Sequence, residues 1–349
     1  MQSELLSVIR ENKRNILLIS RKDGRNAERD RRRNSLDLIS NIEEVKSISS
    51  KLKTKAPICA TELSVLRNRL ADDEENVKAF LSVNGGLNGL IRELTGSCPE
   101  RQVCACECLS NICVMSSDAA SFIIKNAAAY LYTTLDSLNF ELVVTTTRCL
   151  GNIASCGVTQ CDQLKELGCV ARLIGLLDSP HHILREATLY SLIHYVFTMK
   201  DKASEEFILV CLEKILKLKM SLIASQLLFY LSCNESCVQI TMYNEKYIVN
   251  ITQICANLHE KYVGEMNKEK LWEIKYLLRT LANLCCVENN SNLCLKYLNE
   301  SSIFNYFHMV LQNQCPILFS TLNWFLSNIY KYSTNVEYRV FFFNKLVNS

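Results

Sequence analysis

The stretch LKELGCVARLIGLLDSPHHILREATLYSLIHYV, residues 164–196, contains the layout of one structural repeat. Its apolar residues recur at helical spacing, and two breaks interrupt them, one at Gly168 and one at residues 178–180. The spacing predicts a helix before Gly168, a second helix that runs to Leu177 and a long third helix that starts near Ile183. A unit of this size cannot bury its own apolar faces, so we expect it to stack on copies of itself.

Copies of the repeat carry a short signature in the third helix: a leucine, any residue, an asparagine and an apolar residue. It reads LSNI at 109–112, LGNI at 150–153, LANL at 281–284 and LSNI at 326–329, with degenerate copies at 66–69, 192–195 and 231–234. The third positions are residues 68, 111, 152, 194, 233, 283 and 328. We ascribe the one long gap, from 233 to 283, to an inserted corner around residues 264–270. A period of about forty residues is typical of helical solenoids, and it predicts about seven repeats.

Composition agrees with an all-α chain. The 349 residues are 48% hydrophobic but include only 10 glycines and 4 prolines, so few turns depend on these residues. Long helices with short polar corners fit this scarcity, whereas a β-sandwich or a doubly wound sheet does not. The related corner VNGGLNGLIREL at residues 83–94 supports the same layout.

The 18 cysteines are predicted to be small buried apolar residues in a reducing compartment. The first thirty residues are charged, and the apolar run at residues 16–19 is too short for a secretory leader, so we expect no disulfide framework. Paired CxxC motifs with a matching histidine do not occur, and Cys104, Cys106 and Cys108 alternate along one expected helix, which is poor zinc geometry. We therefore expect no metal.

Residues 301–330 contain no Asp, Glu, Lys or Arg, which raises the question of a membrane span. Polar residues interrupt the segment, and its apolar positions recur at helical spacing. A transmembrane helix needs about twenty mostly apolar residues. We therefore predict two buried helices separated by a polar corner, and no membrane partner.

Positive charge is concentrated at one end of the sequence. Residues 1–34 hold ten Lys or Arg and five Asp or Glu, a net charge of +5, while residues 35–349 hold 29 and 31, a net charge of −2. Such an asymmetry indicates a basic arm that meets an acidic surface.

The repeats resemble those of the armadillo family. The resemblance rests on the corner LGCVARLIGLLDS, the earlier corner NGGLNGLI and the asparagine signature, and it covers about residues 57–349. It implies a right-handed superhelix whose third helices line a groove for an extended peptide. An asparagine amide offers a donor and an acceptor, so a row of them can clamp a peptide backbone. The alternative is that each asparagine only joins neighbouring helices. The expected groove residues are Asn68, Asn111, Asn152, Tyr190, His194, Phe229, Asn283, Trp324 and Asn328.

Among armadillo proteins, the importin-α adaptors place a tryptophan four residues before the groove asparagine, where it holds a cargo lysine. Only Trp324 and Asn328 form a full pair here, with Tyr190 and Phe229 as partial substitutes. Arg148 and Arg279 occupy the same position in other repeats and would repel a basic peptide. This departure argues against an ordinary lysine-rich nuclear localisation signal as the ligand.

The arm resembles the importin-β-binding segment that precedes the array in importin-α. The resemblance implies an importin-β-type carrier as partner, because arginines bind the carboxylates of an acidic receptor bidentately. Gly24 departs from the pattern, and a solvated charge run or a nucleic-acid-binding tail remains an alternative. The basic residues concerned are Lys13, Arg14, Arg21, Lys22, Arg25, Arg31, Arg32 and Arg33.

These features predict a basic arm over residues 1–40, a polar linker over 41–56 and repeats over 57–349. The expected function is an importin-α-like adaptor for nuclear import, cytoplasmic and nuclear, with an extended cargo segment in the groove. The alternative is an intracellular scaffold with no transport role. The five histidines are scattered and no catalytic motif occurs, so we expect no enzyme, no cofactor and no small-molecule substrate. Nucleic acid is not the expected partner and enters only as the alternative for the arm.

Overall fold

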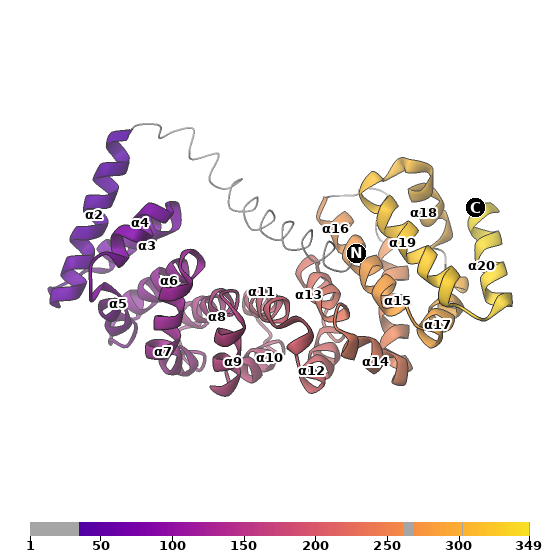
Figure 1. The fold of residues 1–349 in the computed structure, drawn as a ribbon, viewed down its shortest axis with the longest axis horizontal. Coiled ribbons are helices and arrows are strands. Elements are labelled where there is room, and N and C mark those ends of the chain that lie inside the picture. Colours follow the sequence, from indigo (N-terminus) through magenta and orange to yellow (C-terminus); the bar gives the residue numbers. More distant parts are fainter. Residues whose placement is uncertain (1–34, 261–267, 302, 349) are drawn as a thin grey trace. The chain divides into compact units, whose positions relative to one another are not determined.

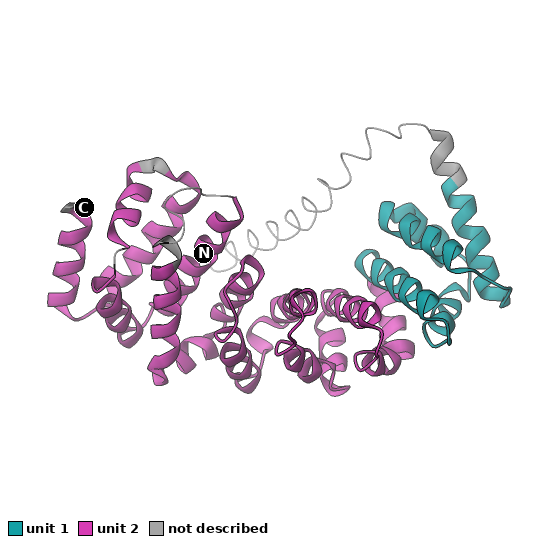
Figure 2. Cartoon of the chain, turned by 180° about the vertical axis from the view of Figure 1, so that it is seen from behind, with its two compact units in different colours: residues 1–115 teal, residues 116–349 magenta. Residues whose placement is uncertain are grey.

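The structure is a computed structural model that describes residues 35–260, 268–301 and 303–348. Within these ranges the chain is helical and contains no strand, so the all-α prediction is confirmed (Figure 1). The chain divides into two compact units, residues 1–115 and residues 116–349 (Figure 2). The basic arm and its eight candidate residues lie outside the described residues.

The first unit contains helices α2 to α6. Their bounds are α2 Ser35–Thr54, α3 Ala60–Asp72, α4 Glu74–Leu81, α5 Gly86–Leu94 and α6 Pro99–Met115. Helix α2 packs against α3, α4 and α5, and α3 packs along α6. The NGG corner lies between α4 and α5, where Gly85 has a φ of 96°, a left-handed value that favours glycine.

The segment 41–56, predicted as a polar linker, instead forms most of α2. Its overall polarity hides an apolar stripe, because Val45, Ile48 and Leu52 recur at helical spacing and are buried. Gly89 on α5 allows the close contact with this helix, since a Cβ there would lie 2.6 Å from Cβ of Leu52. Thus α2 is part of the core of the first unit.

The second unit continues the repeats from residue 116 to the C-terminal end. Its elements are α7 Ser117–Thr134, α8 Phe140–Ala154, α9 Val158–Glu166, α10 Cys169–Leu176, α11 His182–Met199, η1 Lys200–Lys202, α12 Glu205–Ile215, α13 Leu222–Ser232, α14 Glu235–Tyr243, α15 Glu245–Glu260, α16 Lys268–Leu284, α17 Glu288–Asn299, α18 Phe304–Met309, the π-helical turn η2 Val310–Gln314, α19 Pro316–Tyr332 and α20 Val336–Asn348.

The quoted stretch folds as its pattern predicts. Helices α9, α10 and α11 are the three helices of the unit, and the corner residue Gly168 has a φ of 77°. The inserted corner proposed around residues 264–270 is only partly described, and residues 268–270 belong to the start of α16 rather than to a corner.

Side-chain caps replace glycine and proline at many corners of the second unit. Ser116, Asn139, Ser204 and Ser221 each accept a hydrogen bond from a backbone N–H in the first turn of the helix that follows. Such caps satisfy donors that a helix start leaves open. The scarcity of Gly and Pro is therefore compatible with sharp helix boundaries.

Most of the cysteines are buried, as predicted, and all 18 are free thiols. Burial raises the pKa of Cys156 and of Cys169 to about 11, so these thiols stay protonated at neutral pH. In the segment 301–330, α18 and α19 are separate helices joined by η2 and Cys315, in agreement with the prediction of two helices. Of the helices in the described ranges, none combines the length and apolar character that a membrane crossing requires.

Candidate functional site

The third helices of the repeats are neighbours within each unit. In the first unit α3 packs on α6, and in the second unit α8, α11, α13, α16 and α19 pack in that order. We call the signature third positions, and the positions four residues before them, the third-helix face. Residues four apart on a helix share one side of it, so each pair presents two side chains one turn apart.

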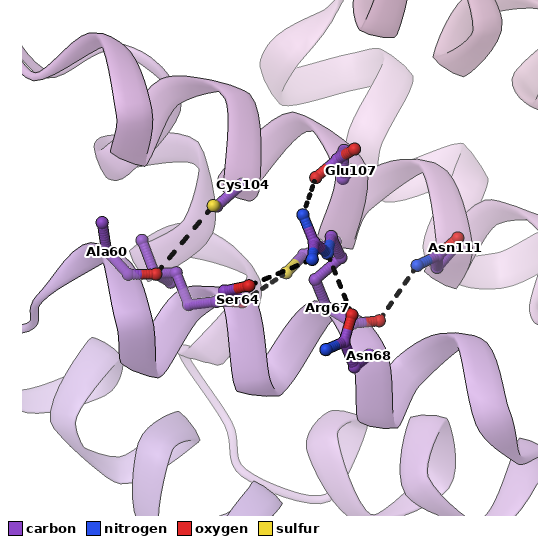
Figure 3. Close-up of polar contacts among 9 residues, drawn as sticks. Ala60, Ser64, Arg67, Asn68, Cys104, Glu107 and Asn111 are labelled. Atoms are coloured by element: carbon purple, nitrogen blue, oxygen red, sulfur yellow. Dashed lines mark hydrogen bonds and ion pairs between the residues drawn. The ribbon is translucent and has the colours of Figure 1, made fainter.

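In the first unit, asparagine and arginine side chains join α3 to α6 (Figure 3). Nδ2 of Asn111 donates to the backbone oxygen of Arg67 at 3.1 Å. The Arg67 guanidinium donates to Glu107 at 2.9 Å, to Ser64 Oγ at 3.0 Å and to Asn68 Oδ1 at 3.1 Å. The hydrogen bond to the Glu107 carboxylate raises the pKa of Arg67. Charge on this part of the face is therefore neutralised internally.

The α8–α11 part of the face is tightly packed. Tyr190 Oη donates to Oδ1 of Asn152 at 2.7 Å, and its ring lies edge-on to His194 with 4.4 Å between the centroids. Asn152 is only 8% exposed and His194 only 3% exposed. The predicted residues are brought together here, but a peptide would reach the Tyr190 ring more readily than the Asn152 amide.

Gly151 makes this tight packing possible. A Cβ at this position would lie 2.7 Å from Cα of Ser191 on α11. Ser191 Oγ in turn donates to the backbone oxygen of Thr147 at 2.6 Å. The glycine of LGNI therefore serves helix packing.

The α13–α16 part of the face combines an amide with a cation. Nδ2 of Asn283 donates to Ser232 Oγ at 2.9 Å. Phe229 is only 5% exposed, and its ring lies 5.6 Å from Cζ of Arg279. We expected the Phe229 ring to contact a cargo lysine. The ring is instead buried, and the Arg279 guanidinium already lies over it.

The last part of the face, on α19, carries the one full pair that the sequence predicts. Trp324 is 39% exposed, and Asn328 lies one turn further along the helix. Nδ2 of Asn328 donates to the backbone oxygen of Ala282 on α16 at 2.7 Å. Trp324 is thus a surface side chain, which leaves its indole open to a ligand.

The asparagines share one arrangement across the two units. Asn111 and Asn328 each donate one N–H to the third helix that precedes their own, and Asn283 donates both to Ser232 Oγ and to Cys233 Sγ at the end of α13. An asparagine side chain also has a carbonyl oxygen, so each retains an acceptor after these bonds. Joining helices and clamping a peptide are therefore compatible roles.

Sequence reasoning missed two features of the face. The first is the Arg67–Glu107 ion pair, whose separation of 40 residues matches the repeat period and could have indicated it. The second is Lys275 on α16, whose Nζ lies 4.4 Å from the ring centroid of Trp272. Neither Lys275 nor Trp272 occupies a signature position, so the repeat pattern alone does not point to them. Among the described residues, no group of acidic, histidine and cysteine side chains is arranged to hold a metal ion.

Comparisons with known proteins address the fold. No protein-family model matches the sequence, and no curated protein matches it. An engineered protein of known crystal structure has a TM-score of 0.65 and 18% identity, over 87% of this chain and 77% of its own. A designed armadillo repeat protein in complex with a (KR)4 peptide has a TM-score of 0.45 and 15% identity, over 82% and 99%. Computationally designed armadillo repeat proteins for modular peptide recognition have a TM-score of 0.43 and 16% identity, over 81% and 99%.

The first of these similarities shows a shared fold. The repeat in this chain consists of two short helices and a long third helix, as in α9, α10 and α11. The chain is therefore an all-α protein built of stacked helical repeats.

Proposed function

We propose that this protein is an importin-α-like adaptor. Its third-helix face binds an extended segment of a cargo protein, and its basic arm binds an importin-β-type carrier. The role is binding rather than catalysis, and it places the protein in both cytoplasm and nucleus. The arm, the short array and the sparse tryptophans also resemble a divergent importin-α relative named transmembrane and coiled-coil domain-containing protein 6.

The observation that carries this proposal is the repeated asparagine on successive third helices. Asn283 and Asn328 lie on α16 and α19, which pack side by side, and each amide is held in place by a hydrogen bond to the preceding third helix. Amides fixed at regular intervals suit the backbone of an extended peptide, whose N–H and C=O groups also recur regularly. Fixing them in advance lowers the entropy cost of binding.

The test of the carrier role uses the full chain and purified importin-β. Changing Arg31, Arg32 and Arg33 together to Ala should weaken binding by at least tenfold, since each loses charge-assisted contacts with an acidic partner. Wild-type affinity should fall as salt is raised, because exposed charges are screened within about 8–10 Å. The matched control changes Lys46, Lys53 and Lys55 to Ala, which removes three positive charges from exposed side chains on α2 and just beyond its end.

Equal loss in the triple-lysine control would indicate a general charge effect and would contradict a specific carrier site. Carrier binding that survives the triple-arginine change would also contradict the proposal.

A scaffold without a transport role is the second candidate, and the cations of the face favour it. Arg148 and Arg279 stand where importin-α carries tryptophan. Basic localisation signals would meet like charge there. Loss of carrier binding with retention of peptide binding would support this candidate over the adaptor.

A further inference from the structure

Two cations lie one turn apart on α16 without an acidic partner among the described residues. Nζ of Lys275 lies over the Trp272 ring, and Cζ of Arg279 lies over the Phe229 ring. No ion pair within 4.0 Å joins either cation to a carboxylate that the structure describes, whereas the nearby Lys270 is paired with Glu273. The positive charge of this cluster is therefore not neutralised by its surroundings in the described chain.

Partial burial makes this arrangement costly for the protein alone. Burial lowers the pKa of Lys275, and the charge of Arg279 lowers it further. Nε of Arg279 is buried and has no hydrogen-bond acceptor. A cation that is withdrawn from water without a partner is unfavourable, and contact with ring faces offsets only part of the cost.

The cluster is part of the third-helix face. Arg279 lies four residues before Asn283, so its side chain and the Asn283 amide are neighbours one turn apart. On α8, Arg148 stands in the same position relative to Asn152 and is exposed. The face of the second unit thus places cations at positions where a peptide side chain would point.

We propose that the face over α13 and α16 binds an anionic side chain, a carboxylate or a phosphate, of a peptide in extended conformation. Arg279 and Lys275 supply the charged contacts, and Asn283 supplies an amide contact to the peptide backbone. A guanidinium presents parallel N–H donors that match carboxylate and phosphate oxygens. This inference rests on the peptide-binding role of the face, and it specifies the ligand as acidic rather than basic.

The test is fluorescence anisotropy on the full chain with three labelled peptides. These are (Glu-Ser)4, its form with all four serines phosphorylated, and (Lys-Arg)4. The first two should bind and the third should not. Arg279→Gln and Lys275→Gln should each weaken the anionic peptides about tenfold, the scale of one lost charged hydrogen bond.

Lys296→Gln on α17 is the matched control, because Lys296 also lies over an aromatic ring, that of Tyr297, but is outside the face. It should change affinity less than twofold. A larger loss for the phosphorylated peptide than for (Glu-Ser)4 identifies phosphate as the preferred group, and equal losses identify a carboxylate.

Melting temperature separates binding from folding. Because neither cation has an acidic partner among the described residues, Arg279→Gln and Lys275→Gln should leave the melting temperature of the free protein unchanged or higher. Arg279→Lys should retain part of the affinity for the anionic peptides, since it keeps the positive charge but loses the parallel N–H donors of the guanidinium. A lower melting temperature in both Gln variants, with all peptides weakened alike, would overturn the proposal.

Three other results would also overturn it. Binding of (Lys-Arg)4 alone would refute the acidic ligand and leave the peptide-binding role of the face intact. Binding of none of the peptides would refute both. Binding of a uridine 20-mer RNA that depends on Lys275 and Arg279 would assign the cluster to nucleic acid instead.

Discussion

In the first unit Arg67 on α3 is paired with Glu107 on α6, whereas in the second unit Arg279 on α16 faces the ring of Phe229 on α13. Glu107 and Arg279 occupy the same place in the repeat, four residues before a signature asparagine. In both places the asparagine joins the two third helices. Helix packing is therefore compatible with a negative or a positive side chain at this position. The charge there can differ between repeats according to the ligand that each repeat binds.

The two regions also differ at the second signature position, Ser110 on α6 and Gly151 on α8. Gly151→Ala should lower the free energy of unfolding of the α8–α11 pair by about 2–3 kcal/mol, since the new Cβ overlaps the Ser191 backbone. Hydrogen exchange of α8 and α11 measures this local effect.

Gly175→Ala on α10 is the control, because nothing lies within 4 Å of the added Cβ. It should stabilise the protein by about 0.5–1 kcal/mol through helix propensity. Equal effects of the two substitutions would contradict the role given to Gly151.

Exposure of Trp324 makes α19 the aromatic part of the second unit's face. Trp324→Ala should weaken a ligand that combines acidic residues with one lysine by about 1–2 kcal/mol if the indole holds the lysine. It should cost less than about 1 kcal/mol of stability, because over a third of the side chain is already in water. Calorimetric titration measures the change in affinity, and thermal melting measures the change in stability.

A loss of about 3–5 kcal/mol in the free energy of unfolding, typical of a buried tryptophan, would show that Trp324 belongs to the core. A stable variant with unchanged ligand affinity would leave Trp324 without a binding role.

Breaking the Arg67–Glu107 ion pair of the first unit is expected to have the next largest effect on stability. Arg67→Gln should destabilise the α3–α6 pair by about 1 kcal/mol, because the partly exposed pair and its side-chain hydrogen bonds are lost together. Hydrogen exchange of α3 and α6 is the measurement, with Arg69→Gln as a control that breaks a different ion pair of α3. High salt should reduce the difference between wild type and Arg67→Gln.

Removing the charge of Lys275, which has no acidic partner among the described residues, should stabilise the protein, whereas Arg67→Gln should destabilise it. Lys275→Met should raise the free energy of unfolding of the α13–α16 pair by about 0.5 kcal/mol, since it removes repulsion from Arg279 and keeps an apolar contact with Trp272. Destabilisation of the same size as in Arg67→Gln would remove the contrast between the two regions.

Sequence periodicity located every third helix, including α3, whose signature is degenerate. The spacing of apolar residues in α9 to α11 is a local property of the chain, so the order of residues alone indicates these helices. The pattern failed for residues 41–56, because charges and serines surround the buried stripe of α2 and lower its mean hydropathy. The pattern also failed to predict that Phe229 is buried, because a residue's position in the repeat does not determine how closely the next helix approaches it.

By itself, the sequence determined the helical class, the repeat period and the positions of the asparagines and the cations, because these follow from residue order and helix geometry. Only the tertiary structure decided which side chains are open. Trp324 is exposed and Phe229 is buried although both stand at the same repeat position. Arg67 finds Glu107 forty residues away, while Lys275 and Arg279 find rings instead of carboxylates. The exposure of a side chain and its partners depend on the helix that packs beside it. The sequence of one helix does not determine which helix that is or how closely it packs.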